Sequence, residues 1–189
     1  MNAVKANAGF TPIHTFVIGI SFLEKVMNSV KKIAMFMCVA LPVFAHAGES
    51  AVKWHDFNDY RDVRSSNQAK GSYHKHIIKS FEAHMTKLAE QLPNEYKLNV
   101  EFTDLDLAGD VRYGGMDEIR IVKPIYFPRI KLNYSLTNKD GSVVNKGNDV
   151  ELKDMGFMDK IKMGRDESFY YEKRLLTEWF GEQILVNLN

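Results

Sequence analysis

The chain has 189 residues, of which 45% are hydrophobic and 26% are charged, with a formal net charge of +1. This composition excludes a disordered tail, and the length allows one well-buried core rather than two full domains. The single cysteine, Cys38, lies in a segment that we expect to be removed. We therefore exclude disulfides, cysteine-ligated zinc and a cysteine nucleophile.

Residues 27–47 have the features of a cleavable secretory signal peptide. Two lysines at 31–32 precede an apolar stretch at 33–44, and Ala45-His46-Ala47 places small residues at the two positions that signal peptidase reads. The apolar stretch is shorter than the roughly twenty residues that span a membrane. We expect cleavage before Gly48, export to the periplasm and no membrane span after cleavage.

Residues 1–26 precede a natural start at Met27, which is followed by Asn-Ser-Val-Lys-Lys. We interpret them as an upstream extension from a wrongly chosen start codon. The first 47 residues hold four lysines and one glutamate, so the remaining 142 carry 21 basic and 23 acidic side chains. A domain with a net charge near −2 has no general attraction for phosphate backbones, so we expect no nucleic-acid partner.

The mature chain, 48–189, is predicted to be a single domain that opens with a strand at 52–57 and a polar loop at 64–71. Ser72 is the predicted N-cap of the first helix. Apolar residues then recur three and four positions apart and define one buried face: Ile77, Phe81, Met85, Leu88 and Leu92. Pro93-Asn94 is expected to stop this helix.

Alternating residues predict a second strand at 96–102 that continues to Leu107, followed by a turn at 114–117. Strand character resumes at 119–122, but Pro124 and Pro128 indicate an edge strand or a bent one. The next segment predicts a hairpin, with strands at 130–136 and 143–152 around a turn at 138–141. Gly141 supplies the left-handed turn residue and Gly147 is a possible bulge.

Ser168 is expected to cap a second helix with a buried apolar face: Leu175, Leu176, Trp179, Phe180, Ile184, Leu185 and Leu188. The order of strand, helix, strands with a hairpin, and helix predicts an α+β fold. We expect a two-layer sandwich of two amphipathic helices on a mostly antiparallel sheet, preceded by the signal peptide.

The densest group of potential ligands is acidic. Asp104 and Asp106 share a face of the second strand, with Asp110 and Arg112 beyond. Paired carboxylates suit Ca²⁺ or Mg²⁺, but the spacing of an EF-hand loop is absent. The alternative is that the carboxylates face water beside the buried Leu105 and Leu107, and that Arg112 and Arg120 form salt bridges with them. We favour this alternative and expect no metal and no cofactor.

The histidines offer a second candidate site. His55 with Asp56 or Asp59 would make an acid–base pair. His74, His76 and His84 on the first helix lack the four-residue spacing of helical zinc ligands, so a surface or hydrogen-bonded role is favoured. Motifs for a serine nucleophile or a phosphate loop are absent, and no residue is assigned a catalytic role.

Five segments carry a family resemblance. They are KWHDFNDYRDVR (53–64), KGSYHKH (70–76), TDLDLAGDVRYG (103–114), IRIVKPIYFPRIKLNYSL (119–136) and LKDMGFMD (152–159). The chain resembles the domain-of-unknown-function family 3016 (DUF3016), small exported proteins of Gram-negative bacteria. The resemblance implies export and assigns no activity. A looser fold-level likeness is to periplasmic envelope modules.

Two functions are compatible with these observations. We favour a non-enzymatic periplasmic module that binds an envelope protein or a cell-wall component. The alternative is a small periplasmic hydrolase or metal-dependent enzyme that uses His55 or the Asp104/Asp106/Asp110 cluster. A concave pocket with convergent titratable groups would favour the enzyme, and an exposed apolar patch or an open sheet edge would favour the binding module. The sequence leaves the oligomeric state open.

Overall fold

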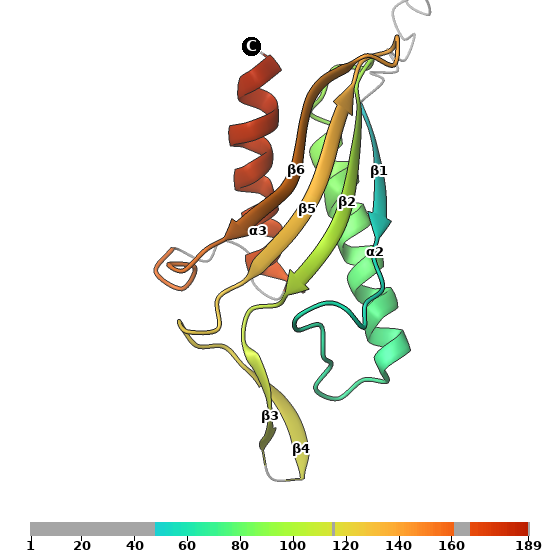
Figure 1. Cartoon of the computed structure of the whole chain (residues 1–189). Coiled ribbons are helices and arrows are strands. Elements are labelled where there is room, and N and C mark those ends of the chain that lie inside the picture. Colours follow the sequence, from blue (N-terminus) through green and yellow to red (C-terminus); the bar gives the residue numbers. More distant parts are fainter. Residues whose placement is uncertain (1–47, 115, 161–166, 189) are drawn as a thin grey trace, which may run out of the picture. The chain divides into compact units, whose positions relative to one another are not determined.

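The computed structural model describes residues 48–114, 116–160 and 167–188. The predicted extension and signal peptide, together with Cys38, lie outside these residues, as does Gly115 in the predicted turn. Figure 1 shows the described part as a curved sheet accompanied by two helices, with a separate hairpin at one end of the sheet.

The main sheet has four strands in the order β1-β2-β5-β6. They are β1 (Glu49–Trp54), β2 (Lys97–Asp106), β5 (Arg129–Thr137) and β6 (Val143–Lys153). β1 runs parallel to β2, and the other two pairings are antiparallel. The prediction of an α+β fold with a mostly antiparallel sheet is confirmed. Helix α2 (Lys70–Ala89) connects the parallel pair, and α3 (Tyr170–Trp179) follows the sheet.

Alternate residues of the two central strands form one wall of the core. Leu98, Val100 and Phe102 of β2 are almost fully buried, as are Leu132 and Leu136 of β5. Residues on both helices complete the same cluster: Ile77, Phe81, Met85 and Leu88 on α2, and Leu175, Leu176 and Trp179 on α3. The predicted buried face of the first helix is confirmed, although Leu92 lies beyond the helix end.

The second predicted helix is longer than α3 and changes form. Beyond Trp179 the backbone continues as a π-helical segment, Phe180–Leu185, and a final 3₁₀ turn, Val186–Leu188. Phe180 and Ile184 are buried as predicted, whereas Leu185 and Leu188 are half-buried.

The predicted helix caps are wrong. Helix α2 begins at Lys70 after Ala69, which makes no side-chain cap, so Ser72 lies inside the first turn. Helix α3 begins after Phe169, which adopts a left-handed conformation with φ of 58°, so Ser168 is not the cap. The Phe169 ring packs against Phe81 and Tyr73. Tertiary packing of this ring, rather than local capping, therefore accompanies the start of α3.

Two irregularities shift the register of the sheet. A bulge between Phe102 and Asp104 allows Leu105 to be buried and keeps Asp104 off the core face. The bulge predicted at Gly147 lies immediately after it: Gly147 pairs with Tyr134, and Asn148 and Asp149 together face Asn133. A Cβ atom at position 147 would lie 2.5 Å from the Tyr134 ring, so the close approach of this ring requires glycine.

The region with Pro124 and Pro128 does not belong to the main sheet. Strands β3 (Asp110–Gly114) and β4 (Asp117–Ile121) form a separate two-stranded hairpin. Figure 1 shows this hairpin extending from the end of the sheet where β2 finishes and β5 begins. Neither proline lies in a strand: β4 ends at Ile121 and β5 starts at Arg129.

Candidate functional site

Charged side chains gather where hairpin β3–β4 meets the main sheet. They come from the loop after β1, the end of β2, both hairpin strands and the start of β5. We call this group the arginine–aspartate cluster: Asp62, Asp104, Asp106 and Asp110 with Arg61, Arg64, Arg112, Arg120 and Arg129.

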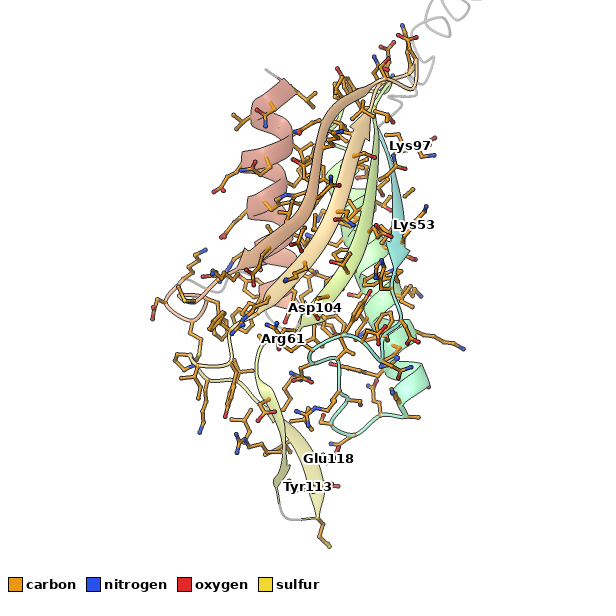
Figure 2. All side chains as sticks on the ribbon, in the orientation of Figure 1. Lys53, Arg61, Lys97, Asp104, Tyr113 and Glu118 are labelled. Carbon is orange, nitrogen blue, oxygen red and sulfur yellow. The ribbon has the colours of Figure 1, made fainter. Side chains whose placement is uncertain are left out.

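Asp104 and Asp106 share one arginine, as expected for residues on the same face of a strand. The Arg61 guanidinium lies 3.8 Å from a carboxylate oxygen of each, and the Arg61 backbone N–H donates to Asp104 at 2.9 Å. Figure 2 shows Arg61 and Asp104 together near the end of β2. Their carboxylates are only about one-fifth exposed, with side-chain values of 20% and 19%, so the expectation that they face open water is wrong. Burial raises the pKa of Asp106, and nearby Arg129 and Arg61 oppose that change.

Asp110 is held by two other arginines. Its carboxylate accepts a hydrogen bond from Arg64 at 2.8 Å and pairs with Arg112 at 2.9 Å. Arg112 also donates to the Tyr126 hydroxyl. The predicted salt-bridge role of Arg112 is therefore confirmed, and these contacts tie β3 to the loop after β1 and to the segment before β5.

The buried centre of the cluster is the Asp62–Arg120 pair. The two side chains approach to 3.2 Å and are only 12% and 17% exposed. The Arg120 guanidinium also donates to the carbonyl oxygens of Gly109 at 2.9 Å and Arg64 at 2.8 Å. Because the planar guanidinium fork donates in several fixed directions, Arg120 joins β4, the turn before β3 and the loop after β1.

A buried carboxylate lies behind this centre. Glu172 on α3 is 3% exposed and accepts the Ala108 backbone N–H at 2.6 Å. Burial raises the Glu172 pKa, while the Ala108 hydrogen bond and the charge of Arg120 act in the opposite direction. Helix α3 is thereby connected to the backbone at the base of the hairpin.

The hairpin held by these contacts exposes apolar side chains. Tyr113 is 84% exposed on β3, and Figure 2 shows it beside Glu118, its register partner on β4. Ile125, in the segment after β4, is 69% exposed. Three more large apolar residues join them on the same part of the chain: Met116, Ile119 and Val122. We call these five residues the hairpin patch.

A hollow of about 420 Å³ lies between the loop after β1, the start of α2 and Glu118. Arg61, Arg64 and Lys70 contribute positive charge to it, while Phe57 and His74 contribute stacked rings 4.6 Å apart. Burial lowers the pKa of His74, and Lys70 adds to the effect. The lining of the hollow thus mixes apolar and charged side chains.

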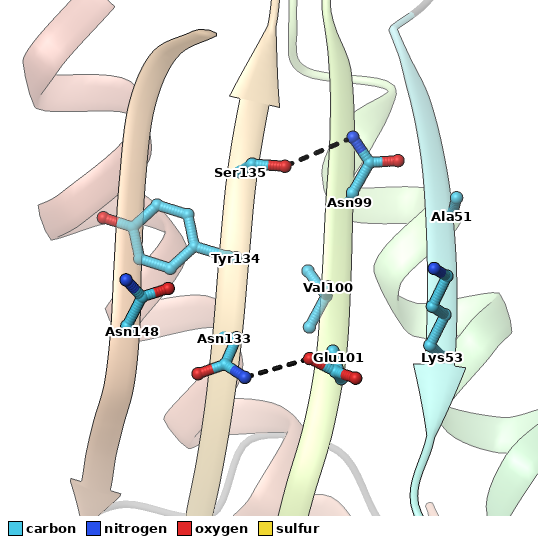
Figure 3. Close-up of a pocket in the computed structure, with 9 residues that line it drawn as sticks. All are labelled: Ala51, Lys53, Asn99, Val100, Glu101, Asn133, Tyr134, Ser135 and Asn148. Atoms are coloured by element: carbon cyan, nitrogen blue, oxygen red, sulfur yellow. Dashed lines mark hydrogen bonds between the residues drawn. The ribbon is translucent and has the colours of Figure 1, made fainter.

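The face of the main sheet shown in Figure 3 is polar, and both helices lie behind it. A shallow depression of about 360 Å³ is lined here by residues such as Lys53, Asn99 and Ser135. Asn133 donates to Glu101 at 2.9 Å, and this bond lowers the Glu101 pKa, with His55 contributing. His55 pairs with Glu101 at 3.1 Å, so the carboxylate beside its ring comes from β2 and not from the neighbouring Asp56 or Asp59.

The three helix histidines lie in different surroundings. The His84 ring is hydrogen-bonded to the Lys173 carbonyl at 2.9 Å, and burial lowers its pKa. His74 stacks on Phe57, and His76 lies near the Phe169 ring. Within the described parts of the chain, no group of three or more potential ligands is arranged to hold a metal ion.

Sequence reasoning named Asp104, Asp106, Asp110 and Arg112, and it expected Arg120 to pair with these carboxylates, whereas Arg120 pairs with Asp62. Asp62 was not singled out, and Glu172 was absent from the candidates. The available signal for Asp62 was its place between two apolar residues, Tyr60 and Val63, that are both buried. Asp117 lies opposite Gly114 on the hairpin.

The geometry defines an α+β domain in which a partly buried ion-pair cluster holds a hairpin with exposed apolar side chains. Its sequence matches the family described as "Protein of unknown function (DUF3016)" over residues 48–182. The chain belongs to this family, as its five segments predicted. Comparisons with curated proteins and with solved structures find no match. Across the described residues, no helix combines the length and apolar character needed to cross a membrane.

Proposed function

We propose that the chain is an exported periplasmic protein, and that its mature domain is a non-enzymatic module that uses the hairpin patch to bind an envelope protein. In this proposal the domain is a two-layer sandwich in which the helices cover one face of the sheet. Support for export comes from the signal-like segment at 27–47 and from the family match, which begins at Gly48.

The observation that carries the binding role is the hairpin patch. The exposed side chains lie on both faces of the hairpin, because Tyr113 is opposite Glu118 and Ile119 is opposite Arg112. Large apolar residues left exposed on one projecting element mark a candidate interaction site. Arg120 on β4 and Asp110 on β3 form ion pairs with the loop after β1, so both hairpin strands are held in place before a partner binds. Binding then costs little conformational entropy of the hairpin. The hairpin segment carries both signs of charge, with Asp117 and Glu118 on one side and Arg112 and Lys123 on the other, and such a mixed surface suits a protein partner.

Photo-crosslinking in intact cells tests the proposal. A photoreactive residue replaces Tyr113 in one version and Asn99, on the polar sheet face, in the control. We expect a discrete adduct from position 113 and none from position 99. The identified partner is then purified, and Tyr113→Ala with Ile125→Ala should weaken its binding at least tenfold, because exposed apolar anchors carry most of the affinity. Equal adducts at both positions, or unchanged affinity of the double variant, would contradict the proposal.

A further inference from the structure

The backbone of Gly48 lies at the carboxyl end of α2. Its N–H donates to the Leu92 carbonyl at 3.2 Å, and the Glu49 N–H donates to the Tyr96 carbonyl at 3.0 Å. Helix α2 ends at Ala89, and the Leu92 N–H donates back to the Ala89 carbonyl at 2.9 Å. The backbone of Gly48 is therefore hydrogen-bonded to the turn that follows the end of α2.

Side-chain atoms have no room at position 48. A Cβ atom there would lie 2.6 Å from the Leu92 Cβ, 2.9 Å from the Ala89 carbonyl oxygen and 3.1 Å from the Tyr96 carbonyl oxygen. Real Cβ atoms do not approach other atoms this closely, so glycine permits the contact. Three carbonyl groups thus surround the backbone where we expect the mature chain to begin.

The carboxyl end of a helix carries a partial negative charge, and cations near it are stabilising. We propose that cleavage between Ala47 and Gly48 creates an α-ammonium group that binds the Leu92 carbonyl oxygen beside the carboxyl end of α2, so that processing of the exported chain completes the fold. In that cleavage water adds to the Ala47 carbonyl carbon and the bond to the Gly48 nitrogen breaks. The products are a carboxylate on the leader and the ammonium on Gly48.

This inference rests on the proposed export, and it can be tested apart from it. The charged groups on the segments that meet Gly48 are Glu49 of β1, Lys87 and Glu90 at the end of α2, Glu95 after it, and Lys97 of β2. Glu49 pairs with Lys97, and Glu95 pairs with Lys139. Carboxyl groups ordinarily titrate near pH 4, lysines near 10 and an α-amino group near 8. A change in the stability difference between about pH 7 and 9 can therefore be attributed to titration of the α-amino group.

The experiment compares two purified proteins that lack the leader. One begins at Gly48, and the other retains positions 45–47 with His46→Ala, so that no imidazole is added. The melting temperature of the first should be about 1–4 °C higher at about pH 7 and low salt. This is the shift that the stabilisation by a cation at a helix end would produce in a domain of this size. The charged form is favoured in the folded state, so the advantage is present below about pH 8 and is lost as the pH rises.

The control protein begins at Gly48 and carries the same three alanines after Asn189. Its melting temperature should equal that of the protein that begins at Gly48 without them. Equal melting of the two test proteins at about pH 7 would overturn the inference. So would a difference that persists at about pH 10, because the added residues rather than the lost charge would then be responsible. Sequencing of the periplasmic protein tests export separately, since a different natural start would refute the cleavage site and leave the measured role of the ammonium unchanged.

Discussion

Arg120→Met removes the centre of the arginine–aspartate cluster while keeping most of the side-chain volume. The guanidinium is 17% exposed, pairs with Asp62 and donates to the carbonyl oxygens of Gly109 and Arg64. After the substitution Asp62 keeps only its contact with Arg64 at 3.2 Å among the described side chains, and its carboxylate stays mostly buried. The change thus removes one of the two guanidinium groups that contact a mostly buried carboxylate, and it leaves the carbonyl oxygens of Gly109 and Arg64 without this donor.

Breaking a buried ion pair by removing one member costs about 3–5 kcal/mol. Domains of this size have unfolding free energies of about 5–15 kcal/mol, so the loss is a large fraction of the total. It corresponds to a fall of about 10–20 °C in melting temperature. Arg112→Met is the matched control. Arg112 is 57% exposed and pairs with Asp110 of the same cluster, so its loss should cost no more than about 1 kcal/mol.

Urea unfolding of both variants measures these changes, and native-state hydrogen exchange shows where they act. Faster exchange should be concentrated in β3–β4 and in the loop after β1, because these are the segments that Arg120 joins. Arg120→Lys should recover only part of the stability, since an ammonium group cannot donate as a planar fork. Equal costs for Arg120→Met and Arg112→Met would refute the central position assigned to Arg120.

Three further predictions concern other parts of the molecule. Trp179 is 3% exposed and its ring lies 5.2 Å from that of Tyr134, so Trp179→Ala should cost about 3–5 kcal/mol in a thermal melt; an unchanged midpoint would contradict its place in the core. Millimolar Ca²⁺ or Mg²⁺ should leave the melting temperature unchanged, because Asp104, Asp106 and Asp110 already face arginines; occupancy at a hundred times the dissociation constant would instead add about 2.7 kcal/mol. Burial raises the folded pKa of Glu172, so this group favours folding more as the pH falls from neutral toward its unfolded pKa. Glu172→Gln keeps an acceptor for Ala108 and should flatten this pH dependence, and an unchanged profile from pH 4 to about 7 would contradict the assignment.

The sequence by itself determined the fold class and most of the elements. Alternation places Leu98, Val100 and Phe102 on one face of a strand, and recurrence at three and four residues places Ile77, Phe81 and Met85 on one face of a helix. These patterns follow from the local backbone geometry of a strand or a helix. They can therefore be recognised without knowing which elements pack against each other. The same reasoning located the turn at Gly141, whose φ is 77°.

Tertiary structure alone decided the helix starts, the partner of each charge and the separation of the hairpin from the main sheet. Phe169, not Ser168, precedes α3, because ring packing across the core outweighs a local capping preference. His55 pairs with Glu101 across 46 positions and Arg120 with Asp62 across 58. Side chains so far apart in the sequence meet only when the chain has folded, and no local pattern records which of many arginines and carboxylates will be brought together.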